Sequence, residues 1–146
     1  MKIGKNCHID TMLFSTEPYL IEIGDHVAIA VGTQFVTHDG GTFCFSEELH
    51  DCDVFGKIVI GNNIHIGTSC TILPNTSIGN NCIIGACSVV RGKFPENSVI
   101  IGNPAKIVTN MSVQKFLYQH NAGLLKTGRM TDAEKEPIVK KHFDIK

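Results

Sequence analysis

The sequence predicts an all-β chain, a parallel β-helix of about five coils with one extruded loop and a short C-terminal helical segment. Three observations predict this fold. Aliphatic residues recur every six positions from Ile60 to Val90, glycines or paired asparagines follow many of them, and two stretches interrupt the pattern. A period of six fits no α-helix, whose faces recur at about 3.6 residues, but it keeps residues on one face of a strand.

The repeat runs through residues 60–89 as IGNNIH IGTSCT ILPNTS IGNNCI IGACSV. Three units make one triangular coil of 18 residues, so residues 18 apart stack, as in Ile60 on Ile78 and Thr68 on Ala86. Gly and Asn-Asn suit the corners, where positive φ costs least for Gly and is tolerable for Asn. The fifth, inward-facing positions include three cysteines, expected to be buried free thiols: Cys7, Cys70 and Cys82.

The same phase occurs upstream, at Ile3 and Ile9 and again at Ile23, Ile29 and Phe35. The step of fourteen residues from Ile9 to Ile23 predicts a two-residue insertion within 10–22. Residues 39–57 contain nothing periodic and predict a loop extruded from a corner. Loops of this length in a compact domain are more often functional than not.

The domain boundaries predicted are residues 1–107 for the β-helix and 108–146 for a C-terminal helical extension. SVQKFLYQHNAGLL and TDAEKEPIVKKHF both read as helices, and the second opens with Thr131 and Glu134 at capping-box spacing. These helices are expected to cover the open end of the β-helix, whose last coil would otherwise expose strand edges. A mobile tail is the alternative.

The composition indicates a globular protein, with 42% apolar and 18% charged residues and a net charge of −1. No basic run suits nucleic acid, and no apolar stretch suits membrane insertion. The N-terminal MKIGKNCHID lacks the apolar stretch of a signal peptide, which predicts a cytoplasmic location.

The repeat, the segment THDG with its loop, and IIGNPAKIV after the last coil together resemble the hexapeptide-repeat acyltransferases. The resemblance is greatest to sugar and capsular-polysaccharide O-acetyltransferases and to the galactoside, maltose and xenobiotic acetyltransferases. It covers roughly residues 1–110 and implies a left-handed β-helix, a homotrimer with its active sites between subunits, and acetyl-CoA as co-substrate. It also implies that the catalytic histidine near the loop is His38.

The resemblance further assigns cofactor positions. Thr68 and Ala86 match positions whose backbone contacts the pantetheine arm, and Arg91 and Lys106 match positions near the nucleotide and its phosphates. Residues 54–95 contain no Asp or Glu, which favours a bound polyanion there. His65 stands where the family often has a bulky aromatic, so it either lines the pantetheine path or caps the coil.

His38 is a candidate general base because neutral imidazole is basic near pH 7 and can deprotonate a hydroxyl during direct transfer in a ternary complex. A carboxylate that orients its ring is expected. Three candidates are Asp39, Glu22 and Asp25, although the side chain of Asp39 should point away from that of His38.

The loop is expected to contact the acceptor, a sugar-type hydroxyl compound. Phe43 and Phe45 either pack on a neighbouring subunit or stack against a sugar face. The main alternative function is N-acetylation of an amino sugar, with a nucleotide-linked amino sugar included. No metal is expected; a zinc enzyme on the same fold would need three converging histidines, and a non-catalytic scaffold would tolerate loss of His38.

Overall fold

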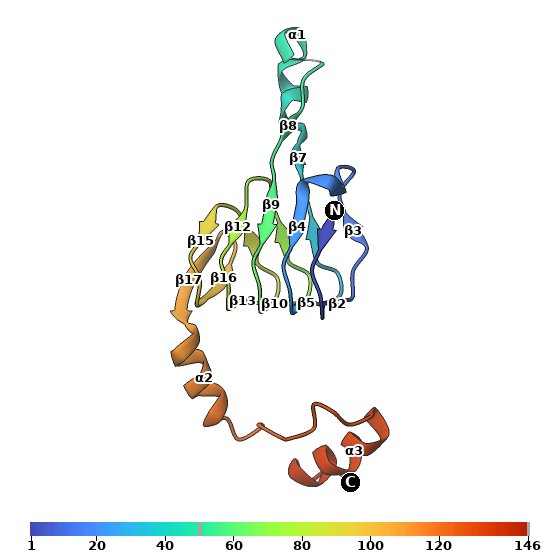
Figure 1. The fold of residues 1–146 in the computed structure, drawn as a ribbon, viewed down its shortest axis with the longest axis vertical. Helices are drawn as coiled ribbons and strands as arrows, with labels where there is room; N and C mark the ends of the chain where they lie inside the picture. The colour runs from blue at the N-terminus through green and yellow to red at the C-terminus, as the bar shows by residue number, and fades with distance from the viewer. Residues whose placement is uncertain (50, 146) are drawn as a thin grey trace. The chain divides into compact units, whose positions relative to one another are not determined.

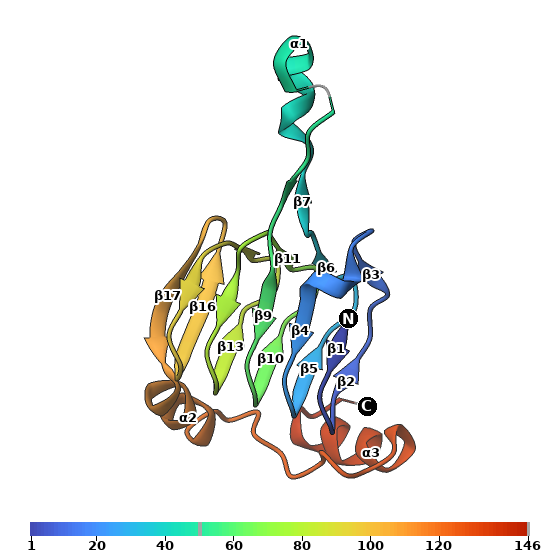
Figure 2. The ribbon, with the colours of Figure 1, turned by 45° about the horizontal axis from the view of Figure 1, so that its top comes forward.

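A computed structural model describes residues 1–49 and 51–145, so His50 and Lys146 lie outside the described residues. The chain winds through three parallel sheets in turn, which makes a parallel β-helix (Figures 1 and 2). Sheet A contains β1 (Lys2–Ile3), β4 (Ile21–Ile23), β9 (Ile58–Ile60), β12 (Ser77–Ile78) and β15 (Lys93–Phe94). Sheet B contains β2 (His8–Ile9), β5 (Val27–Ile29), β10 (Ile64–Ile66), β13 (Cys82–Ile84), β16 (Ser98–Gly102) and β17 (Ala105–Asn110). Sheet C contains β3 (Leu13–Phe14), β6 (Gln34–Phe35), β11 (Thr71–Ile72) and β14 (Val89–Val90).

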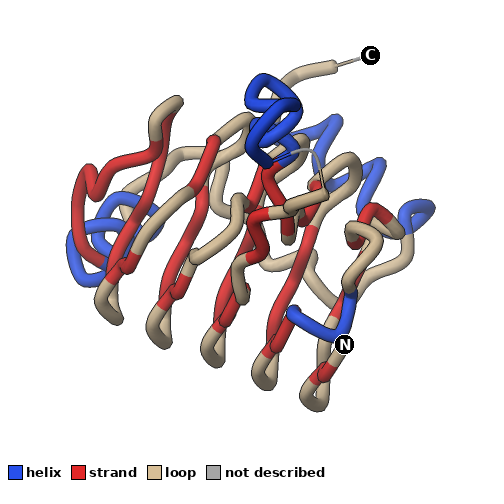
Figure 3. Tube along the Cα trace, turned by 90° about the horizontal axis from the view of Figure 1, so that it is seen from above, coloured by secondary structure: helices blue, strands red, loops and turns tan. Residues whose placement is uncertain are grey.

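The predicted stacking of residues 18 apart is confirmed in the central coils. Ile60 pairs with Ile78 between β9 and β12, and Ile64 pairs with Cys82 between β10 and β13. Figure 3 shows successive coils stacked with their turns aligned. The period shortens after β14, since Ile78 pairs with Phe94, only 16 residues on. Phe94 therefore occupies the position of the aliphatic residue that begins each unit rather than the fifth position.

The core is a column of aliphatic side chains inside the coils. Residues with the same place in successive coils follow one another, as Ile29, Ile66 and Ile84 do in sheet B. Cys70 and Cys82 are buried in this column, and burial raises the pKa of both thiols. Asparagines at the corners after sheet A adopt the left-handed conformation, with φ of 56° at Asn63 and 54° at Asn81. Their side chains form a ladder, because the amide of Asn63 donates to Asn81 Oδ1 at 2.8 Å.

The extruded loop is an antiparallel hairpin rather than an irregular loop. Its stem is β7 (His38–Asp39) paired with β8 (Val54–Phe55), and its outer part contains a 3-10 helix (Gly40–Phe45, η2) and α1 (Ser46–Leu49). The hairpin extends from the corner that follows sheet C (Figure 2). The backbone N–H of Gly56 donates to the carbonyl of Thr37 at 2.8 Å, which closes the stem at its base.

The chain divides into two compact units, Met1–Gln114 and Lys115–Lys146. The first unit extends beyond the predicted boundary at residue 107, because β17 pairs antiparallel with β16 and so belongs to the β-helix. Two helices come after β17 in the chain, α2 (Met111–Gln119) and α3 (Asp132–His142). The predicted capping box of Thr131 and Glu134 is present at the start of α3. Within the described part of the chain, no helix is long and apolar enough to cross a membrane.

Candidate active site

His38 lies where the chain leaves the β-helix to form the hairpin. It is the first residue of β7 and follows the buried residues Phe35 and Thr37. Its side chain is 38% exposed, so the imidazole is held by the scaffold and still reachable from solvent. Asp39 follows it in β7, which places the two side chains on opposite faces of the strand.

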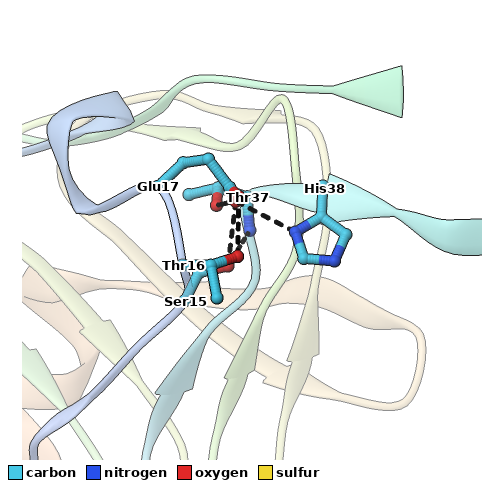
Figure 4. Close-up of polar contacts among 5 residues, drawn as sticks. All are labelled: Ser15, Thr16, Glu17, Thr37 and His38. Atoms are coloured by element: carbon cyan, nitrogen blue, oxygen red, sulfur yellow. Dashed lines mark hydrogen bonds and ion pairs between the residues drawn. The ribbon is translucent and has the colours of Figure 1, made fainter. Parts of the chain in front are cut away.

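A carboxylate contacts this histidine, and it belongs to Glu17. Oε2 of Glu17 lies 2.9 Å from Nδ1 of His38. Three hydroxyl groups also donate to the carboxylate: Thr37 to Oε2 at 2.7 Å, Ser15 to Oε2 at 3.4 Å and Thr16 to Oε1 at 2.6 Å. Figure 4 shows Glu17 surrounded by these donors, with the second ring nitrogen of His38 pointing away from it.

The hydrogen bonds determine which ring nitrogen is free. Those from Thr16, Thr37 and His38 lower the pKa of Glu17 from 4.5 to about 2, so the group is a carboxylate at neutral pH. A carboxylate can only accept hydrogen bonds, so Nδ1 of neutral His38 must carry the proton. Nε2 then keeps its lone pair and faces away from Glu17, as a general base requires.

The three carboxylates predicted as orienting partners have other contacts, which corrects that prediction. Glu22 lies on the outer face of sheet A between Lys57 at 2.9 Å and Lys2 at 3.1 Å, and those hydrogen bonds lower its pKa. Asp25 accepts from a backbone N–H at the corner after sheet A, at 2.7 Å. Asp39 accepts from a backbone N–H within η2. Among the contacts of the described residues, none joins these three carboxylates to the imidazole of His38.

Glu17 escaped prediction because it lies outside the repeat. The first two coils are offset by 20 residues at β1 and β4, where Lys2 pairs with Glu22, and not by 18. The extra residues lie after β3, where the chain forms a 3-10 helix (Pro18–Leu20, η1). The predicted insertion within 10–22 therefore exists, and Glu17 is in it. This insertion and the hairpin leave the β-helix at the same corner of adjacent coils. That coincidence of two interruptions was the sequence signal that could have pointed to Glu17 as the partner of His38.

An aromatic ring lies beside His38, and an ion pair lies on the other face of the hairpin stem. The ring of Phe55, its cross-strand partner in β8, lies edge-on with the ring centroids 6.2 Å apart. On the other face of the stem, Oδ2 of Asp39 lies 3.6 Å from Nη2 of Arg91. The aromatic side chain that contacts the imidazole is thus Phe55, while Phe43 and Phe45 lie in η2, 85% and 58% exposed.

The predicted cofactor residues lie on two corners of the β-helix. Thr68 and Ala86 stack at the corner between sheets B and C, where the N–H of Cys87 donates to the carbonyl of Thr68 at 2.9 Å. Arg91 follows β14 and lies at the corner of His38. Sheet C separates these two corners, so the structure does not bring Thr68 and Ala86 to His38 within one chain. Lys106 is exposed in β17.

His65 points outward from β10 and lines a pocket of about 360 Å³ on sheet B, together with His8 and His26. Within residues 1–49 and 51–145, no group of three His, Cys, Asp or Glu side chains is arranged to hold a metal ion.

Comparison with known proteins agrees with the repeat. The family model described as bacterial transferase hexapeptide (six repeats) matches residues 57–92. Protein CapG of Staphylococcus aureus is 42% identical over 129 residues, which cover 86% of this chain and 75% of CapG. The putative lipopolysaccharide biosynthesis O-acetyl transferase WbbJ of Escherichia coli K12 is 35% identical, with 68% of this chain and 55% of WbbJ covered. The chain thus spans three quarters of the first relative and about half of the second.

A solved structure has the same fold. The hexapeptide-repeat-containing acetyltransferase of Vibrio cholerae O1 biovar eltor, complexed with acetyl-CoA, matches with a TM-score of 0.65 and 29% identity. The match covers 75% of this chain and 59% of that protein. These neighbours imply the left-handed form of the β-helix. From its repeat, its fold and its relatives, the chain belongs to the hexapeptide-repeat acyltransferase family.

Proposed function

We propose that this protein is an acetyl-CoA-dependent O-acetyltransferase that acts on a hydroxyl of a sugar or polysaccharide precursor, with His38 as the general base. The observation that carries the proposal is the pair of Glu17 and His38, which leaves Nε2 free beside the hairpin. The relatives support the reaction, since WbbJ is named for O-acetyl transfer in lipopolysaccharide biosynthesis.

The proposed mechanism is one direct transfer in a ternary complex. Nε2 of His38 accepts the proton of the acceptor hydroxyl while its oxygen attacks the acetyl carbonyl. The C–S bond then breaks, and the imidazolium returns its proton to the departing thiolate, which yields an O-acetyl ester and coenzyme A. Glu17 holds Nδ1–H throughout and stabilises the positive charge on the ring. Such base catalysis typically contributes about 10²–10⁴-fold in rate.

The proposal includes a homotrimer with shared sites. The ridge of Thr68 and Ala86 is exposed and carries small side chains, which suits close approach by an extended pantetheine arm. This ridge and His38 occupy different corners of one chain. Two neighbouring chains can face one groove with both corners, and Arg91 then lies on the same side of that groove as His38. Sedimentation of the purified protein should give the mass of three chains.

The proposal is tested with the purified protein and a panel of sugars and amino sugars. Free coenzyme A is measured with a thiol reagent, and binding of acetyl-CoA is measured by the rise in melting temperature. We expect acceptor-dependent release of coenzyme A and an ester product. If acetyl-CoA is not consumed with any acceptor and also does not raise the melting temperature, the proposal is overturned. An amide product would favour the amino-sugar alternative.

His38→Asn tests the assigned base. It should lower turnover at least about a hundredfold while leaving the melting temperature close to that of the unaltered protein, because the side chain lies outside the core. Unchanged turnover would remove His38 from the mechanism.

A further inference from the structure

One buried threonine differs from the others in what its hydroxyl contacts. The buried threonines of the described chain are Thr11, Thr33, Thr37 and Thr76. Three of them donate to backbone carbonyl oxygens at 2.7 Å, which is the usual way to satisfy a hydroxyl inside a coil. Thr37 instead donates to a carboxylate, Oε2 of Glu17, also at 2.7 Å. Its side chain is fully buried, so this contact cannot be an incidental surface hydrogen bond.

The backbone of Thr37 is hydrogen-bonded through both its carbonyl and its N–H. Its carbonyl accepts from Gly56 at the base of the hairpin, and its N–H lies 3.3 Å from Oγ of Ser15. The backbone on both sides is therefore tied to the coil and to β8. The hydroxyl thus presents a fixed donor to the same oxygen that contacts Nδ1 of His38.

We propose that Thr37 is a positioning residue, whose hydroxyl fixes Oε2 of Glu17 opposite Nδ1 of His38 and shares that oxygen. This inference rests on the proposed function. A carboxylate oxygen that already accepts one short hydrogen bond is a weaker base, so Glu17 orients the imidazole and leaves the proton on the ring. Without the Thr37 hydroxyl, Oε2 keeps only the longer contact from Oγ of Ser15 at 3.4 Å beside that of His38, and the carboxylate is freer to rotate away from Nδ1.

Loss of the Thr37 hydroxyl should have two effects, one on turnover and one on the imidazole of His38. Turnover should fall about 10–100-fold, as is typical when the partner behind a functional group is removed. The share of neutral His38 that carries its proton on Nδ1 should fall, because a carboxylate that rotates away no longer selects that tautomer. Two other charged side chains lie at the same corner, Asp39 in β7 and Arg91 after β14, with Oδ2 of Asp39 3.6 Å from Nη2 of Arg91.

The test compares Thr37→Val with Thr37→Ser and with Thr76→Val. The valine removes the hydroxyl at nearly constant volume, the serine restores it, and Thr76 is a buried threonine whose hydroxyl serves only backbone carbonyls. The first readout needs no acceptor: ¹⁵N NMR of histidine-labelled protein reports which ring nitrogen of neutral His38 is protonated, with His38→Asn used for assignment. The second is kcat and KM for acetyl-CoA with whichever sugar of the panel is acetylated.

We expect Thr37→Val alone to lower the share of the Nδ1–H tautomer of His38 and to lower kcat with little change in KM for acetyl-CoA. Thr37→Ser should behave like the unaltered protein, and Thr76→Val should lower only the melting temperature. If Thr37→Val does not fold, Thr37→Cys, which carries a weak donor, takes its place with the same expected direction.

The two proposals fail separately. An unchanged tautomer ratio and kcat in Thr37→Val, or equal changes in Thr76→Val, would overturn the role of Thr37. A changed tautomer ratio in a protein that acetylates no acceptor would leave the positioning contact in place and would overturn the proposed function instead.

Discussion

Replacing Glu17 with glutamine tests the candidate site most directly. The amide has nearly the same shape as the carboxylate but carries no charge, and its NH₂ group is a donor. If that group faces Nδ1 of His38, it favours the tautomer in which Nε2 carries the proton, which cannot act as a base. If the amide oxygen faces Nδ1, the ring keeps its orientation and loses the charge that stabilises imidazolium.

The magnitude is bounded by the geometry. The whole contribution of a general base is about 10²–10⁴-fold, and Glu17 acts only through His38, so its loss must cost less than that of His38→Asn. Thr16 and Thr37 remain to hold the amide in place, which preserves part of the orientation. We therefore expect kcat/KM to fall about 10–100-fold, with KM for acetyl-CoA unchanged.

Glu22→Gln is the matched control for this assay. Glu22 is also a carboxylate with a lowered pKa, but its partners are Lys57 and Lys2 on the outer face of sheet A. Release of coenzyme A should be nearly the same as in the unaltered protein. Equal losses in both variants, or a loss below about twofold in Glu17→Gln, would refute the assignment of Glu17.

Three predictions concern stability. The pKa of Glu17 is lowered from 4.5 to about 2, so its contribution to stability is fully present above about pH 4.5 and is lost as pH falls toward 2. The melting temperature of Glu17→Gln should therefore vary less with pH in that window than that of the unaltered protein. The same dependence of melting temperature on pH in both proteins would contradict this. Ile66→Ala should lower the unfolding free energy in urea by about 3–5 kcal/mol, because Ile66 is fully buried between two stacked coils that cannot collapse. Ile3 lies in the first coil and is 46% exposed, so Ile3→Ala should cost far less, and equal costs would contradict the stacking. Gly67→Ala should cost about 1–3 kcal/mol or more in the same assay, since its Cβ would lie 2.6 Å from the backbone nitrogen of Ala86, and no loss would show that the coils are less tightly stacked.

Most of the fold follows from the sequence because each coil repeats the same local pattern. The pairing of Ile60 with Ile78 requires only that the phase is kept for 18 residues. The prediction weakens where the phase changes, as at Arg91 and Gly92, where the coil is two residues shorter. Phe94 is apolar and suits either inward position, so hydrophobicity alone could not fix the register there.

The candidate site was predictable only in part. His38 was identified from its place before an unperiodic stretch and from the family resemblance. Its partner was not, because residues within an insertion have no expected stacking position. Asp39 is next in sequence, yet strand alternation turns its side chain away, and it lies near Arg91 instead.

The sequence by itself determined the β-helix, its central register and the place of the extruded segment, because all of these depend on a period of six residues and on its interruptions. The family resemblance added His38 as the candidate base. Only the tertiary structure decided that Glu17 contacts both His38 and Thr37, and that Thr68 and Ala86 lie at another corner. The physical reason is that corners stack across coils. Their partners are set by the number of residues inserted in each coil, and by which way the inserted backbone turns, neither of which a repeating pattern encodes.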